Sequence, residues 1–144
     1  MLDKNFIKEN IQGIQELLKE INSYKHYSLD EIAKDFHLYA SLRYAFIELI
    51  ERAVDINQHL IKEKDGEVPQ DYAETFKILA KMGILDQNFA EKISKSVGMR
   101  NVVVHEYRDV DDKRLYNSID IALDQYPRYC QKILEFIEKE ETKN

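Results

Sequence analysis

One short segment of the sequence combines side chains that could cleave a phosphodiester bond. Residues 100–107 read RNVVVHEY and contain Arg100, His105 and Tyr107. The guanidinium of an arginine stays protonated at physiological pH and presents a planar fork that binds phosphate. A histidine has an ordinary pKa of about 6.5, so it can accept or release a proton there. A fixed cation beside a proton carrier is what cleavage of RNA without a metal ion requires.

Each of these residues also has a structural alternative. His105 could be a histidine whose hydrogen bonds are satisfied in the interior or at the surface, and Tyr107 could be a half-buried packing residue, because the chain has nine tyrosines. Tyr107 has two functional readings as well, stacking on a base or modification by a partner. Asn101 could cap a backbone group or help to position a phosphate. The residue types alone leave these alternatives open.

A second pair, Asp55 and His59, stands four residues apart and therefore shares one face of a helix. These side chains could bind a metal ion or orient Arg100 or His105. Two ligands are too few for a metal site, so we predict no metal and no other cofactor. We expect His59 to form an ion pair on the helix surface.

Arg100 and His105 would not share a face of a regular helix. Five steps of about 100° leave them about 140° apart. The intervening residues 102–104 are three valines, which are only fair helix formers. We therefore expect the helix to end or distort between the two residues, or another element or a second subunit to complete the site.

Apolar residues recur at intervals of three and four along most of the chain, which predicts amphipathic helices. The first covers residues 3–23. Ser28 and Glu31 form a capping-box pattern that opens a long helix to about Lys64, with a bend near Asp35.

Three further helices are predicted after residue 64. Pro69 suits the first turn of the third helix, Gly83 its end, and Asp86 the N-cap of the fourth. The last helix is expected from Asp111 or Asp112 to residue 139, with a kink or division at Pro127 and a frayed tail. The pattern predicts an all-α fold, an up-and-down bundle of four to five helices.

Length and composition predict one domain over residues 1–144, large enough to bury about two-thirds of its unfolded surface. No apolar run approaches the roughly 20 residues of a membrane span, and the N-terminus does not resemble a signal peptide. Cys130 is the single cysteine, so no intrachain disulfide can form, and we expect it in the core. These features favour a cytoplasmic protein without a membrane partner.

The net charge of −6 argues against a broad nucleic-acid-binding surface, because nonspecific affinity comes from neutralising phosphates. Between residues 92 and 108, however, four cations stand against one anion, Glu106. A local basic site on an acidic protein is one reading of this distribution. A solvated helix of mixed charge is the alternative.

The spacing Arg-x4-His-x-Tyr in residues 100–107 resembles the signature of HepT-type toxins of the HEPN superfamily. The similarity extends in order over roughly residues 40 to 120 and includes Leu42-Arg43, Ile47-Glu48, residues 53–61, Val68-Pro69, Tyr72, Phe76, Leu79, Gly83-Ile84 and residues 97–101. Met99 departs from the pattern, which has an aromatic residue before Arg-Asn. This change affects packing rather than chemistry.

The resemblance implies the toxin of a type VII-like toxin–antitoxin pair, a metal-independent endoribonuclease that cleaves cellular RNA, with tRNA as the first candidate and no action on DNA. It implies a two-fold homodimer in which paired motifs line a shared cleft. Arg100 would hold the phosphate, and His105 would transfer a proton. Asp55, which matches a position of the family, would support the site. A nucleotidyltransferase antitoxin, MntA, would silence the enzyme by transferring AMP to Tyr107.

A different class of function fits the same motif. In this alternative the chain is a non-catalytic helical subunit whose dimer cleft binds a nucleotide or docks the nucleotidyltransferase. A phosphate-binding site also needs arginine and histidine, so the motif alone does not separate the two.

Overall fold

The computed structural model describes residues 1–104 and 108–142, and within them all side chains except those of residues 102–112. The described residues form seven α-helices and one 3-10 turn, without a strand, so the predicted all-α fold is confirmed. The elements are α1 (Lys4–Ser23), η1 (Tyr24–His26), α2 (Leu29–Lys34), α3 (Phe36–Glu63), α4 (Tyr72–Lys81), α5 (Gln87–Ser94), α6 (Ser96–Val104) and α7 (Arg108–Thr142).

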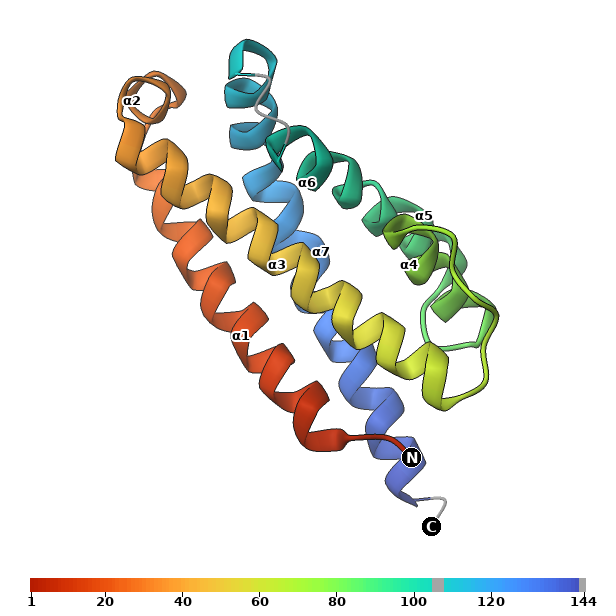
Figure 1. Cartoon of the computed structure of the whole chain (residues 1–144). Helices are drawn as coiled ribbons and strands as arrows, with labels where there is room; N and C mark the ends of the chain where they lie inside the picture. Colours follow the sequence, from red (N-terminus) through yellow and green to blue (C-terminus); the bar gives the residue numbers. More distant parts are fainter. Residues whose placement is uncertain (105–107, 143–144) are drawn as a thin grey trace.

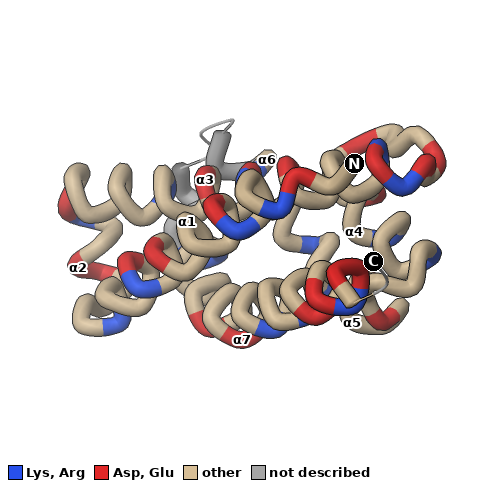
Figure 2. The backbone as a smooth tube through the Cα atoms, turned by 90° about the horizontal axis from the view of Figure 1, so that it is seen from below, with Lys and Arg blue, Asp and Glu red and all other residues tan. Residues whose placement is uncertain are grey.

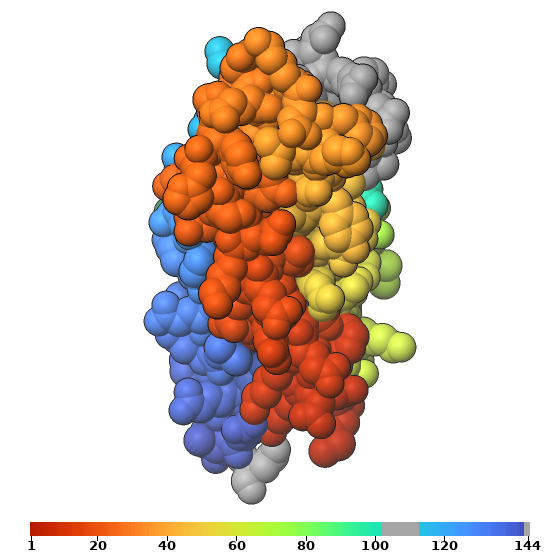
Figure 3. Space-filling view, turned by 90° about the vertical axis from the view of Figure 1, so that its left-hand side faces the viewer, coloured from red at the N-terminus to blue at the C-terminus, as the bar shows by residue number. Residues whose placement is uncertain are grey.

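The three long helices α1, α3 and α7 lie side by side (Figure 1). The short helices α4 and α6 pack against α3, and α5 packs against α4 and α6. On the face shown in Figure 3, α1 lies between α3 and α7. Helix α6 contacts both α3 and α7. Helix α6 carries the first five residues of the RNVVVHEY segment, and its C-terminal end lies toward one end of the bundle (Figure 1).

The seven helices follow the order of the five segments predicted from the sequence, but two of these segments divide and the last helix extends beyond its predicted bounds. Ser28 and Glu31 form the predicted capping box at the start of α2. Asp35 then leaves helical geometry (φ −105°, ψ 108°), and its carboxylate caps α3 by accepting from two backbone amides. The fourth segment begins at the predicted cap, Asp86, and divides at Lys95 into α5 and α6.

Two predicted boundaries are wrong. Helix α4 does not start at Pro69 but at Tyr72, because the Asp71 carboxylate accepts the amide hydrogen of Glu74 and is the N-cap. Pro69 lies in the preceding loop. Helix α7 starts at Arg108, three residues before the predicted start at Asp111. The end of α4 at Gly83 is confirmed, since this residue has a φ of +80°, which favours glycine.

Helix α7 is not divided at Pro127, although proline removes one helical hydrogen bond. Its neighbours Tyr126, Tyr129 and Cys130 are buried in the core, so tertiary packing holds this part of the helix. Burial raises the pKa of the Cys130 thiol to about 12, which keeps it neutral and confirms its place in the core. The helix also continues to Thr142, so residues 140–142, part of the predicted frayed tail, are helical.

Charges of both signs are spread along the helices, with acidic residues gathered at the C-terminal end of α7 (Figure 2). These are Glu135, Glu138, Glu140 and Glu141. None of the helices in the described residues is both long and apolar enough to cross a bilayer.

A buried polar network connects three helices. The Tyr129 hydroxyl of α7 donates to Asn57 Oδ1 at 2.6 Å and lies 3.0 Å from the Ala53 carbonyl oxygen, both in α3. The Asn57 side-chain amide donates to the Thr75 hydroxyl of α4 at 3.0 Å. Because all these groups are buried, each depends on the others for its hydrogen bonds.

Replacing Tyr129 by phenylalanine is expected to lower the free energy of unfolding by about 1–3 kcal/mol, because Asn57 Oδ1 would be left buried without its donor. Urea denaturation followed by circular dichroism measures this change. The matched control is Tyr44→Phe, since Tyr44 is 62% exposed. Equal stability of the two variants would show that the network contributes nothing.

Candidate functional site

Arg100 is held by residues from two other helices. Its Nη2 donates to Glu51 Oε1 of α3 at 2.8 Å, and its guanidinium carbon lies 5.5 Å from the ring centroid of Tyr72 in α4. The Arg100 side chain is 22% exposed. An ion pair and a cation–π contact on a half-buried side chain limit its rotamers, so the structure fixes where this positive charge lies.

The Arg100 fork is only partly used. Its Nη1 donates to Asn101 Oδ1 at 3.3 Å, a long hydrogen bond. Its Nε is buried and has no hydrogen-bond acceptor in the described part of the chain. Unpaired buried donors are rare in native proteins and costly, and they often mark functional positions. Arg100 therefore keeps donor capacity that the protein does not fill.

Asp55 lies on α3, one helical turn after Glu51, and is exposed. Partial burial of its carboxylate and the negative charge of Glu51 raise its pKa, and the Arg52 guanidinium partly offsets them. The carboxylate that pairs with Arg100 is that of Glu51. Asp55 therefore places a second carboxylate near the Glu51–Arg100 ion pair but is not itself the partner of the Arg100 guanidinium.

His59 accepts a backbone hydrogen bond and packs against an aromatic ring, and no ion pair of its side chain is observed among the described residues. Its Nε2 accepts the backbone amide hydrogen of Asp3 at 2.9 Å, and its ring packs against Phe6 with centroids 5.3 Å apart. These contacts join α3 to the start of α1 instead of to Arg100. In the described residues, no group of three or more His, Cys, Asp or Glu side chains is placed to hold a metal ion.

Arg100 lies on α6, which is described up to Val104. The expectation that the helix ends or distorts between Arg100 and His105, or that another element completes the site, stays a prediction. His105, Glu106 and Tyr107 lie outside the described residues, so the predicted contacts of His105 and Tyr107 stay predictions.

Sequence reasoning missed Glu51 and gave no role to Tyr72. Glu51 stands 49 residues from Arg100, and nothing local in the sequence singles it out from the other acidic residues of α3. Tyr72 matches a position of the HepT-type pattern, but this match does not predict its contact with Arg100. That contact results from how α4 packs on α3 and α6.

The family pattern described as HepT-like ribonuclease matches residues 7–133. The tRNA nuclease HepT of Aphanizomenon flos-aquae is 31% identical over 132 residues, which cover 91% of this chain and 89% of the relative. The mRNA nuclease HepT of Shewanella oneidensis is 24% identical over 132 residues, covering 92% of this chain and 88% of the relative.

Solved structures show the same fold. A tri-AMPylated Shewanella oneidensis HEPN toxin in complex with an MNT antitoxin has a TM-score of 0.82 at 23% identity, covering 94% of this chain and 99% of that one. A toxin–antitoxin complex with AMP-PNP has a TM-score of 0.83 at 23% identity, covering 91% and 98%. With the match of the family pattern along most of the sequence, these likenesses identify the chain as a member of the HepT-like family of ribonucleases.

Proposed function

We propose that this chain is the toxin of a two-gene toxin–antitoxin pair and a metal-independent endoribonuclease of the HEPN type. The observation that carries the proposal is the placement of Arg100. Glu51 and Tyr72 fix its guanidinium on α6, and His105 follows five residues later in the sequence. The names of the HepT nucleases support RNA as the substrate class.

In the proposed reaction, a ribose 2′-hydroxyl attacks the adjacent phosphorus. The bond between O2′ and phosphorus forms and the bond between phosphorus and O5′ breaks, which leaves a 2′,3′-cyclic phosphate and a 5′-hydroxyl. His105 takes the proton of the 2′-hydroxyl. Water gives a proton to the leaving O5′, and the hydroxide formed takes the proton back from His105. Arg100 offsets the charge that develops on the phosphate oxygens. Asn101 and Asp55 have supporting roles in this proposal.

A two-fold homodimer would place two copies of the motif in one cleft. The chain carries a net charge of −6, which disfavours RNA binding. Pairing would bring the same cations from both protomers to one cleft and so double the positive charge there. The proposed substrate is cellular RNA in the cytoplasm, with tRNA tested first because the relative at 31% identity is a tRNA nuclease. DNA lacks the 2′-hydroxyl and is not a substrate in this mechanism.

The proposed antitoxin is an MntA-like nucleotidyltransferase. The Tyr107 oxygen would form a bond to the α-phosphorus of ATP, with release of pyrophosphate and the hydroxyl proton. A solved relative of this fold is an AMPylated toxin with an MNT antitoxin, which supports the pairing. The added phosphate would place negative charge in the cleft, where it repels the RNA backbone.

Expression of the wild type and of the Arg100→Ala and His105→Ala variants tests this proposal. The wild type should arrest growth, and RNA profiling should show cleaved tRNA or another cleaved RNA. Cells that express either variant, at the same protein level as the wild type, should grow normally. A wild type that binds a nucleotide or the antitoxin without cleaving RNA would favour the non-catalytic alternative.

Glu51 is expected to act as a positioning residue for Arg100. Replacing Glu51 by alanine frees the guanidinium and should lower kcat about 10–100-fold, because small displacements of a catalytic group have large effects on rate. KM should change less, and Glu51→Gln, which keeps a hydrogen-bond acceptor, should recover part of kcat. Steady-state kinetics with a labelled RNA measures both constants.

The matched control for this prediction is Glu9→Ala, an exposed glutamate on α1. If Glu51→Ala loses no more kcat than this control, Glu51 does not position Arg100 for the reaction.

A further inference from the structure

A pocket of about 540 Å³ lies between α3, the α5–α6 segment and α7, and Arg100 does not line it. Phe46, Leu49 and Ile50 of α3 form an apolar part of its wall, together with Met99 of α6 and Ile121 of α7. Pockets of this volume with an apolar lining and a few polar groups are typical of small-ligand sites.

The charged side chains that line this pocket are all cations: Lys92, Lys95, Lys113 and Arg114. None of these four makes an ion pair with a carboxylate of the described residues, whereas other lysines do, such as Lys25 with Asp120. On a chain with a net charge of −6, this is a concentrated positive lining. It attracts anions, and two of the four cations noted in the sequence between residues 92 and 108, Lys92 and Lys95, belong to it.

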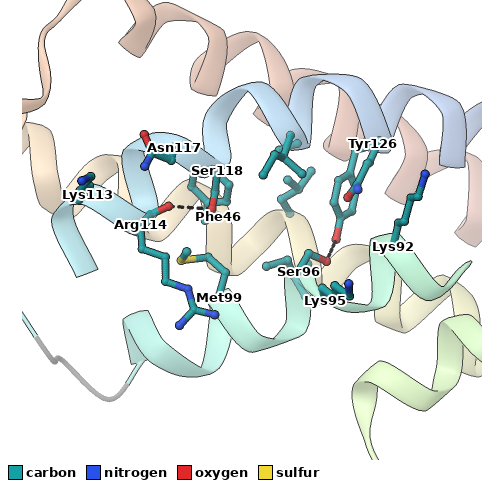
Figure 4. A pocket seen from close by; sticks show the side chains of 15 residues that line it. Phe46, Lys92, Lys95, Ser96, Met99, Lys113, Arg114, Asn117, Ser118 and Tyr126 are labelled. Atoms are coloured by element: carbon teal, nitrogen blue, oxygen red, sulfur yellow. Dashed lines mark hydrogen bonds between the residues drawn. The ribbon is translucent and has the colours of Figure 1, made fainter. Parts of the chain in front are cut away.

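The cations stand at two ends of the pocket. Figure 4 shows Lys113 and Arg114 at one end and Lys92 and Lys95 at the other, with Met99 and Ser96 between them. Near the second end, the hydroxyls of Ser96 and Tyr126 are hydrogen bonded at 2.7 Å. The amide side chains of Asn117 and Gln125 also line the pocket and can donate to or accept from a base edge.

Positive charge at both ends and apolar surface in the middle fit a nucleoside between two phosphates. A second copy of this chain fits less well, because a symmetric partner would bring a like-charged lining against this one. The pocket also adjoins the catalytic segment in sequence and space: Met99 lines it, and Arg100 follows directly but turns to Glu51 of α3.

The geometry points to this pocket as a binding subsite for a nucleotide of single-stranded RNA that flanks the scissile bond. Its base packs on Met99 and the apolar residues of α3, and its two phosphates lie against the cation pairs Lys92–Lys95 and Lys113–Arg114. This inference rests on the proposed function for the identity of the strand. Binding itself needs neither His105 nor cleavage.

The test measures RNA affinity in the full-length His105→Ala protein, so that the RNA stays intact. Two double variants are compared, Lys92→Gln/Lys95→Gln and Lys113→Gln/Arg114→Gln, which alter the pocket from different helices. The matched control is Lys19→Gln/Lys62→Gln, which removes two exposed charges that do not line the pocket. The probe is a fluorescein-labelled single-stranded RNA of about 12 nucleotides, followed by fluorescence anisotropy over a range of salt concentrations.

Each pocket variant should raise Kd at least about fivefold, and the slope of log K against log salt should flatten by about 1.4, as expected for two lost phosphate contacts on a single strand. The control should stay within about twofold. Pocket variants that bind like the control overturn the inference. So does loss of dimer mass in light scattering by these variants alone, which would assign the pocket to a second copy.

Incubating the same RNA with the wild type separates this inference from the proposed function. Pocket-dependent binding without any cleavage would refute the nuclease proposal and support the subsite. Cleavage of the RNA together with an affinity that does not depend on the four cations would support the nuclease proposal and refute the subsite.

Discussion

Replacing His105 by alanine is expected to reduce the rate of RNA cleavage by about 100- to 10,000-fold, the range that a positioned general acid–base group contributes. In the proposed mechanism His105 takes the proton of the 2′-hydroxyl, and neither Arg100, which stays protonated, nor Tyr107, since a tyrosine has an ordinary pKa of about 10, can replace it at neutral pH. Single-turnover cleavage of a labelled RNA measures the rate.

The matched control is His26→Ala, an exposed histidine in the 3-10 turn. This control should cleave at the wild-type rate, and circular dichroism should show both variants folded. Cleavage by His105→Ala at the rate of the control would remove His105 from the mechanism.

AMP transfer to Tyr107 is expected to lower RNA cleavage about as far as the loss of His105 does. The added phosphate carries negative charge into a site that must bind the RNA backbone. The wild type is incubated with the antitoxin and ATP, the adenylated residue is located by mass spectrometry, and the remaining cleavage rate is measured. Tyr107→Phe should keep its activity under these conditions because it has no hydroxyl to modify.

Tyr44→Phe is the matched control for this experiment, since Tyr44 is exposed on α3 and should leave silencing unchanged. An adenylate found elsewhere but not on Tyr107, or equal silencing of Tyr107→Phe, would contradict the proposed regulation.

The features of the fold that the sequence predicts are those set by local chemistry. The capping box of Ser28 and Glu31 and the cap at Asp86 depend on residues three positions apart. The end of α4 at Gly83 depends on one residue with positive φ. These signals do not need knowledge of the tertiary structure, so they identify helix boundaries correctly.

The boundaries that the sequence misplaces are those where two local signals compete or packing decides. Pro69 and Asp71 can each open a helix, and the side-chain hydrogen bond from the Asp71 carboxylate determines the start of α4. Pro127 interrupts the helical pattern, but the buried tyrosines around it keep α7 continuous.

The candidate site shows the same division. Residues 100–107 identify a phosphate-binding and proton-transfer motif from their types and spacing. Arg100 contacts Glu51, which is far away in the sequence. Lys92 and Arg114 also come from separate segments and line opposite ends of one pocket. Such contacts depend on how α6 packs between α3 and α7, which no local pattern specifies.

Analysis of RNA ends tests the central claim most directly. Purified wild type is incubated with tRNA in the presence of EDTA, and the new 3′ ends are sequenced with and without removal of cyclic phosphates. The account predicts 2′,3′-cyclic phosphate ends from the wild type and no new ends from the Arg100→Ala/His105→Ala double variant. New ends that appear only when a divalent metal is supplied, or that the double variant produces equally, would contradict it.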